Sequence, residues 1–155
     1  MQRVIKFRGK RIDNGEWVYG SLFEEEPPLR CLSEKEKEKS KFVIMKSGFA
    51  DWGLPRPMDE CYVHPQTIGQ YIGIKDDTGI EIYEGDIVRT SSDDDGEAIS
   101  EVVWGGNEDY PAFDLSPSQN DECNSISYFQ ACGKIEVIGN IHESPELLKM
   151  KTNAQ

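Results

Sequence analysis

Few residues of this sequence have both the type and the spacing that catalysis or metal binding needs. Cys61 and His64 are three positions apart, a spacing at which two side chains can bind one zinc ion. A structural zinc site needs four converging ligands, and the sequence offers no second pair with similar spacing. It also lacks the Gly-x-Ser-x-Gly motif of a serine nucleophile and a glycine-rich phosphate loop. We therefore expect no catalytic residues, no metal site, no cofactor and no enzymatic activity. A deep pocket that contains His64 or perturbed carboxylates would instead indicate a small enzyme.

The first part of the chain could bind a ligand without catalysing a reaction. Asn14-Gly15 separates two runs of β-branched and aromatic residues, and Asn-Gly is the preferred pair of a two-residue type I′ turn. That turn predicts a hairpin over residues 4–23, in which Ile12 faces Trp17 and Lys10 faces Tyr19. One face of this hairpin forms a candidate binding face of Lys6, Arg8, Lys10, Trp17, Tyr19 and Phe23. The opposite face is the predicted core face, with Ile5, Phe7, Arg11, Val18 and Leu22.

Cations beside aromatic rings are typical of surfaces that bind single-stranded nucleic acid, because the rings stack on bases and the cations neutralise phosphates. The formal net charge of −12 opposes this function, since phosphates would be repelled. Cross-strand packing and cation–π contacts also explain the pattern without any ligand. Single-stranded nucleic-acid binding is therefore an alternative hypothesis.

The charges of the chain are segregated. Residues 1–11 contain five Lys or Arg and no acid, whereas residues 90–133 contain ten Asp or Glu and no Lys or Arg. The candidate acidic contact face consists of Asp93, Asp94, Asp95, Glu97 and Glu101. Opposite charges attract within one chain or between copies, and a contact between unlike faces of two copies closes a ring or extends a filament. We expect homo-oligomerisation or binding of another protein. A second alternative is an acidic DNA mimic that inhibits a nucleic-acid-binding protein.

Short runs of apolar residues between turn residues predict a mainly β fold, either a small barrel or packed β-hairpins, with one short C-terminal helix beginning at Ser144-Pro145. We expect a single domain over residues 1–148, with a variable charged loop at 24–41, an irregular loop at 48–59, a barrel-like part at 62–143 and a frayed tail at 149–155. Besides the hairpin, the predicted strands are 42–45, 67–75, 80–83, 87–88, 99–104, 112–115, 126–129 and 135–141.

The composition is that of a globular chain with 37% hydrophobic residues. Its longest unbroken apolar run, Phe42 to Met45, is far shorter than the ~20 residues that span a bilayer. Charged residues interrupt the apolar residues at the N-terminus, unlike in a secretory signal. We therefore expect no contact with a membrane, a location in the cytoplasm and four reduced cysteines.

Five blocks of the sequence resemble the YopX-like family of phage and prophage proteins. The blocks are Ile5–Lys10, Asp13–Gly20, Val63–Asp76, Gly79–Val88 and the pair Glu136–Ile141 with Pro145–Leu148. The resemblance implies a phage or prophage origin and a mostly β fold. With that origin, the expected location is the host cell cytosol, the expected protein partner is a host or phage protein, and the acidic DNA mimic would inhibit a host protein. It provides no catalytic residues, because members of the family lack an established biochemical role.

Overall fold

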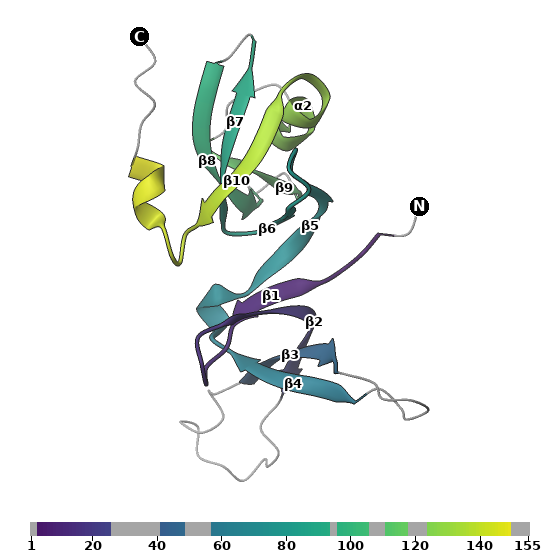
Figure 1. The fold of residues 1–155 in the computed structure, drawn as a ribbon. Helices are drawn as coiled ribbons and strands as arrows, with labels where there is room; N and C mark the ends of the chain where they lie inside the picture. The colour runs from purple at the N-terminus through teal and green to yellow at the C-terminus, as the bar shows by residue number, and fades with distance from the viewer. Residues whose placement is uncertain are drawn as a thin grey trace. The chain divides into compact units, whose positions relative to one another are not determined.

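The computed structural model describes residues 3–25, 41–48, 57–93, 96–105, 111–117 and 124–149 (Figure 1). The chain divides into two compact units, Met1–Gln70 and Tyr71–Gln155. Each unit has a hydrophobic core of its own, so the region predicted as one domain contains two cores. No helix in the described parts of the chain is long and apolar enough to cross a membrane.

The first unit is a curled antiparallel sheet in which the strands follow the order β4-β3-β2-β1. Alternating side chains of this sheet form the core, because Val18, Ile44, Cys61 and Val63 are buried on one face. The first residues of β5 (Gly69–Lys75) pair with the other side of β1. The remaining elements are β1 (Phe7–Lys10), β2 (Trp17–Glu25), β3 (Lys41–Ser47), β4 (Met58–Val63) and the short 3-10 helix η1 (Pro65–Thr67).

The end of β4 returns to the end of β1, which curls the sheet around its core. The backbone N–H of Ile12 donates to the Tyr62 carbonyl at 2.9 Å, and the N–H of His64 donates to the Lys10 carbonyl at 2.9 Å. These hydrogen bonds do not extend into a ladder, so the described strands do not close into a barrel. The predicted mainly β fold is confirmed in the form of packed hairpins and sheets.

The β1–β2 hairpin is confirmed, but its predicted register is wrong. Lys10 faces Trp17 rather than Tyr19. A type I′ turn requires positive φ at both Asn14 and Gly15, and only Gly15 has it, at +72°. The chain instead forms a longer loop, which moves the pairing by two residues. Because side chains alternate with a period of two, this shift leaves the side chains of β1 and β2 on their predicted faces. Ile5, which was predicted to lie on the core face, precedes β1 and is 61% exposed.

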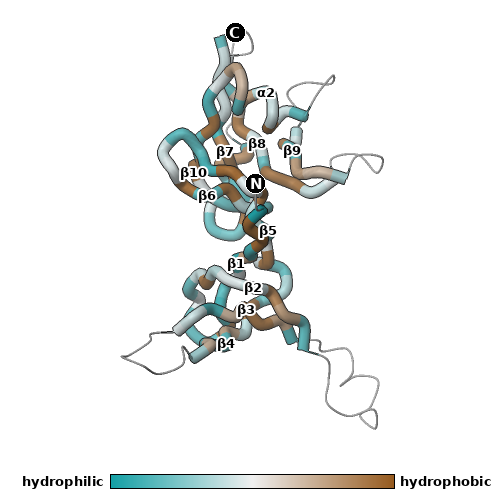
Figure 2. The backbone as a smooth tube through the Cα atoms, turned by 90° about the vertical axis from the view of Figure 1, so that its right-hand side faces the viewer, coloured by the Kyte–Doolittle hydropathy of each residue, from teal (hydrophilic) through white to brown (hydrophobic). Residues whose placement is uncertain are grey.

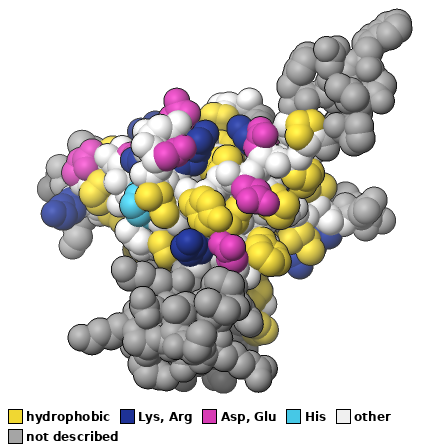
Figure 3. Space-filling model, turned by 90° about the horizontal axis from the view of Figure 1, so that it is seen from below, with side chains coloured by type: hydrophobic (Ala, Val, Ile, Leu, Met, Phe, Trp, Pro, Cys, Tyr) yellow, Lys and Arg dark blue, Asp and Glu magenta, His cyan; other side chains and the backbone are white. Residues whose placement is uncertain are grey.

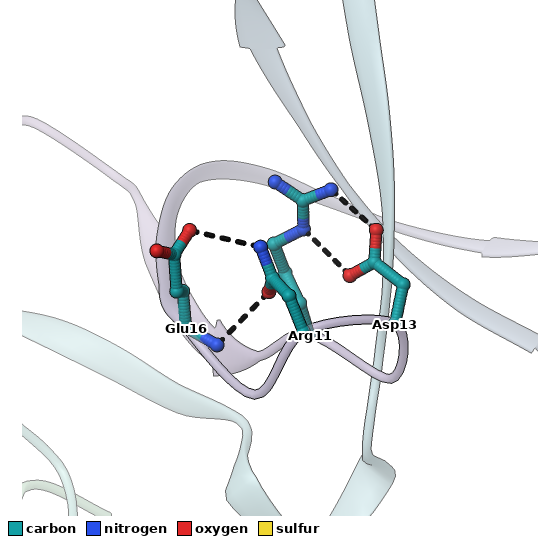
Figure 4. A network of polar contacts seen from close by, with 4 residues as sticks. Arg11, Asp13 and Glu16 are labelled. Carbon is teal, nitrogen blue, oxygen red and sulfur yellow. Dashed lines mark hydrogen bonds and ion pairs between the residues drawn. The ribbon is translucent and has the colours of Figure 1, made fainter.

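Side-chain hydrogen bonds hold the longer loop (Figure 4). The guanidinium of Arg11 donates two hydrogen bonds to the Asp13 carboxylate, one of them at 2.9 Å. The amide oxygen of Asn14 accepts from the backbone N–H of Glu16 at 3.0 Å. The hydrogen bond from Arg11 lowers the pKa of the Asp13 carboxyl below its usual value. The charge of Arg11 is therefore balanced within the loop.

The second unit contains the rest of β5 and a four-stranded sheet with the order β10-β7-β8-β9. The pairing of β5 with β6 is interrupted between Tyr71 and Lys75, where Gly73 has a φ of +100°. Figure 2 shows hydrophobic stretches in the strands of both units. The further elements are β6 (Glu81–Tyr83), β7 (Asp86–Ser92), β8 (Gly96–Trp104), β9 (Phe113–Ser116), α2 (Ser125–Cys132), β10 (Lys134–Asn140) and the 3-10 helix η2 (Pro145–Lys149).

The strand predicted at 126–129 is wrong, because these residues belong to helix α2. Asn124 caps the helix, since its side-chain oxygen accepts from the Ser127 N–H at 3.0 Å. The same side chain donates to the Phe113 carbonyl at 2.8 Å, which fixes the helix to β9. Ile126 and Phe129 are three positions apart, so they share one helix face, and both are buried in the core of this unit.

The other predicted strands all overlap observed strands, but no strand was predicted where β4 lies. Met58 and Asp59, at the end of the predicted irregular loop, begin that strand. The predicted C-terminal helix is the 3-10 helix η2. The charged loop predicted at 24–41 lies outside the described residues except for its ends, and the predicted tail lies outside them beyond Lys149.

The carboxylate of Asp76 fixes the β5–β6 turn to strand β10. One of its oxygens accepts from the Thr78 N–H at 2.9 Å, the Thr78 hydroxyl at 2.7 Å and the Ile80 N–H at 2.9 Å. The other oxygen accepts from the Val137 N–H at 3.0 Å. Burial alone would raise the pKa of this carboxyl, but the hydrogen bonds together outweigh burial and lower it.

Candidate functional site

The sheet of the first unit has a second face, opposite its core, which we call the outer face. Residues directly opposite each other in neighbouring strands share a face, and the pairing places Phe23 beside Val43 and Val43 beside Tyr62. The outer face therefore extends from β1 across β2 and β3 to β4. Its aromatic, basic and apolar side chains are Arg8, Lys10, Trp17, Tyr19, Phe23, Lys41, Val43, Met45, Met58 and Tyr62.

The structure places five of the six predicted binding residues on this face. Lys6 precedes β1 and is half-buried. The guanidinium carbon of Arg8 lies 4.9 Å from the centroid of the Trp17 ring, and the Nζ of Lys10 lies 6.0 Å from it. The ring of Trp17 is thus in cation–π contact with two cations. Arg8 is only 6% exposed, so its guanidinium is removed from solvent.

The aromatic side chains farther along β2 are exposed. Tyr19 is 49% exposed and Phe23 is 55% exposed, although both lie in the middle of a paired strand. Exposed aromatic side chains that lie together on one face of a sheet commonly mark an interaction site. Figure 3 shows hydrophobic side chains at the surface of the molecule, with basic and acidic side chains intermixed among them.

Tyr62 belongs to the same surface and was not predicted from the sequence. It is 39% exposed, the Nζ of Lys41 lies 5.6 Å from its ring centroid, and its hydroxyl donates to the Glu25 carboxylate at 3.2 Å. The negative charge of Glu25, with that hydrogen bond, raises the pKa of the Tyr62 hydroxyl. The alternation of Tyr62 with the buried Cys61 and Val63 was the only sequence signal for its outward orientation.

The outer face is not acidic, in contrast to the chain as a whole, whose formal net charge is −12. Its strands contribute the solvent-accessible cations Lys10 and Lys41, the carboxylates of Glu25 and Glu60, and the buried Arg8. Lys10 and Lys41 lie opposite Trp17 and Glu25, toward the two ends of β2. These two lysines therefore bracket the exposed aromatic residues of β2.

The described residues of the candidate acidic contact face lie on the β7–β8 hairpin. Asp93 and Glu97 are exposed at the tip of this hairpin. Glu101 is half-buried, and burial together with the neighbouring charge of Glu84 raises the pKa of its carboxyl. The remaining predicted members, Asp94 and Asp95, lie outside the described residues.

Cys61 and His64, the two residues with a spacing that a metal ion could use, lie in different surroundings. Cys61 is buried in the core of the first unit, while His64 lies after β4 and is half-buried. A pocket of about 410 Å³ beside β4 has a mostly polar lining and does not include His64; it is lined by Arg11, Lys46, Met58, Asp59, Glu60 and Cys61. Among the described residues, no group of three or more His, Cys, Asp or Glu could hold a metal ion.

The comparisons with known proteins identify the family. The family model described as YopX protein matches residues 6–149. The chain belongs to the YopX family. It is similar in fold to protein EF1440 from Enterococcus faecalis, whose crystal structure has a TM-score of 0.53 and 22% sequence identity over 95% of this chain and 99% of that chain. No curated protein matches the chain.

The family assignment confirms the resemblance drawn from the five sequence blocks. The region that matches the YopX family runs from the residue before β1 to the end of η2. Both the outer face and the β7–β8 hairpin lie inside it. The two surfaces are therefore part of the YopX region of the chain and not additions at its ends.

Proposed function

We propose that this YopX-family protein is a non-enzymatic assembly module, a phage or prophage product of the host cytosol, that binds further copies of itself through the outer face. The observation that carries the proposal is the set of exposed aromatic side chains on one face of the sheet, Tyr19 and Phe23 on β2 and Tyr62 on β4. Tyrosine, tryptophan and arginine dominate the binding energy of protein interfaces, because they offer large rigid areas with a polar end. Non-covalent association through such a face needs no catalytic group.

The contacts within the outer face favour a protein partner over a nucleic acid. Bases would stack on ring faces, but Arg8 and Lys10 contact the ring of Trp17, and Lys41 contacts that of Tyr62. The buried guanidinium of Arg8 is also withdrawn from any phosphate. With a chain charge of −12, phosphate attraction would be weak. A protein surface can instead use the exposed sides of Tyr19 and Phe23.

The charges of the chain favour a second copy of the protein over an unrelated acidic protein as the partner. The same chain carries a stretch, residues 90–133, with ten carboxylates and no Lys or Arg. Lys10 and Lys41 of the outer face are complementary to such a stretch, and complementary charges guide association and fix orientation. Every copy would then bring both partners of the contact.

Sedimentation velocity over a range of protein concentrations tests the proposal. We expect the wild-type protein to exceed its monomer mass of 17.6 kDa and to dissociate in part as salt rises from about 50 to about 500 mM. The double substitution Tyr19→Ser with Phe23→Ser should remove the association. The matched control is Ile80→Ser, which changes an equally exposed apolar residue outside the outer face.

Two results would contradict the proposal. The first is a wild-type protein that stays monomeric at every concentration and salt. The second is retention of a single-stranded oligonucleotide that disappears in the Tyr19→Ser, Phe23→Ser protein, which would assign the outer face to nucleic acid instead.

A further inference from the structure

We infer that the outer face of one copy binds the β7–β8 hairpin of the next copy, so that the protein assembles head to tail. This inference rests on the proposed self-association and names the partner surface. It follows from the pattern of side chains on β8 and from the charges of the outer face.

The outer side of β8 alternates carboxylates with aliphatic side chains. Glu97, Ile99, Glu101 and Val103 are every second residue of the strand and therefore share one face. The exposed Glu97 and the half-buried Ile99, Glu101 and Val103 all retain contact with solvent. This strand offers aliphatic groups for Tyr19 and Phe23 and carboxylates for Lys10 and Lys41.

One cation of the hairpin, Arg89, shares this face with Glu97 and Glu101. Arg89 lies opposite Ile99, diagonally between the two carboxylates, and its guanidinium is 3.6 Å from a third carboxylate, that of Glu136. Glu97 lies opposite Ser91, and Glu101 lies opposite Ile87, so neither carboxylate has a cation directly opposite it. The carboxyl of Glu101 is also close enough to Glu84 for the two charges to repel. A lysine from a second copy would relieve that repulsion.

Pairing of two outer faces with each other is less favourable than head-to-tail contact. In such a pair Lys10 and Lys41 would meet only the carboxylates that the outer face itself carries, Glu25 and Glu60, because a twofold contact joins identical surfaces. In the head-to-tail contact the lysines meet the carboxylates of the hairpin as well. Each copy then has one outer face and one hairpin to offer, so association continues beyond two copies until a ring closes or a filament forms.

Mixing two variants separates this arrangement from every symmetric one. The first variant, Tyr19→Ser with Phe23→Ser, lacks the outer face but keeps the hairpin. The second, Glu97→Gln with Glu101→Gln, lacks the hairpin charges but keeps the outer face. We expect each variant alone to self-associate at least about tenfold more weakly than wild type. An equimolar mixture should form a complex of two chains, about twice 17.6 kDa, and nothing larger.

The controls make each outcome decisive. Glu143→Gln with Glu146→Gln removes the same number of charges from exposed residues outside the hairpin, and it should assemble like wild type. Circular dichroism and the thermal midpoint verify that each variant is folded. If the Glu97→Gln, Glu101→Gln protein assembles like wild type while Tyr19→Ser, Phe23→Ser does not, the hairpin is not the partner and the proposed function still stands. A monomeric wild type overturns both.

Discussion

Replacing Asp76 by asparagine should destabilise the second unit strongly, because one carboxylate there serves two backbone segments. Asp76 is only 6% exposed and accepts four hydrogen bonds, three at one oxygen and one at the other. Asparagine keeps one acceptor oxygen and places an NH₂ group where the other oxygen accepted from the Val137 N–H. A donor then faces a donor, and the N–H of Val137 loses its partner.

The magnitude follows from these contacts. An unsatisfied buried N–H costs about 1–3 kcal/mol. The hydrogen bonds that remain lose their charged acceptor, and a bond to a charged group contributes about 1.5–3 kcal/mol whereas a bond between neutral groups contributes about 1 kcal/mol. We expect the Asp76→Asn substitution to lower the free energy of unfolding by about 3 kcal/mol. For a unit of this size that is a fall in the thermal midpoint of roughly 12–24 °C.

Urea denaturation followed by circular dichroism measures the effect, and amide hydrogen exchange at Val137 locates it. The matched control is Asp77→Asn. Asp77 is exposed and accepts one hydrogen bond, from the Ile135 N–H at 2.8 Å, which the asparagine oxygen can still accept. We expect this control to lose less than about 1 kcal/mol.

The pH dependence gives an independent test of the same contacts. The pKa of the Asp76 carboxyl is lower in the folded state than the ordinary value of 3.8. Its contribution to stability is therefore fully present above that value and is lost as the pH falls through the lower, folded-state pKa. The difference between wild type and Asp76→Asn should be constant from neutral pH to about pH 5 and should shrink below 3.8. Equal stability of the Asp76→Asn and Asp77→Asn proteins at neutral pH would refute the reasoning.

Three further substitutions test other parts of the structure by thermal denaturation. Asn124→Ala should cost about 1–2 kcal/mol by removing the cap of α2, whereas Gln130→Ala on the exposed side of that helix should change stability by less than about 0.5 kcal/mol. Glu101→Gln should raise the thermal midpoint at neutral pH, since burial disfavours the charged form of that carboxyl and raises its pKa. The gain should vanish as the pH falls below the raised pKa, because the wild-type carboxyl is then neutral too. An unchanged midpoint at pH 7 would contradict a raised pKa of Glu101. Gly20→Ala should destabilise the first unit by about 1–3 kcal/mol or more, because the added Cβ would lie 2.2 Å from a backbone oxygen of β3. Ser21→Ala, on the exposed outer face, is the control. Equal thermal midpoints for the two variants would be inconsistent with the close approach of β3 to Gly20.

Local sequence patterns predicted most strands of this fold. They failed where contacts with other parts of the chain determine the local structure. The alternation around Asn14-Gly15 was sufficient to assign both faces of the first hairpin. Its register depended on side-chain hydrogen bonds in the loop, which residue types alone do not rank. Helix α2 was mistaken for a strand because Ile126 and Phe129 suit either structure. Its cap, Asn124, becomes decisive only once that side chain also reaches the Phe113 carbonyl.

The candidate site was predicted in part for the same reason. Trp17, Tyr19 and Phe23 are close in sequence and appeared together on one face. Lys41 and Tyr62 join them only through the pairing of β2 with β3 and of β3 with β4. The sequence also could not show that Arg8 is buried, because burial depends on all the chain segments around it. Cross-strand register, rather than composition, thus determines which side chains form the surface.

The position of β1 has a consequence for synthesis of the protein. This strand is made before both segments that pair with it, β2 on one side and Gly69 and Gln70 at the start of β5 on the other. A nascent chain that ends before Gly69 has one free edge on β1, and unpaired strand edges pair readily with other chains. During translation this edge of the β1–β2 hairpin therefore stays unpaired until Gly69 and Gln70 have left the ribosome. A chaperone that shields the edge would reduce misassembly.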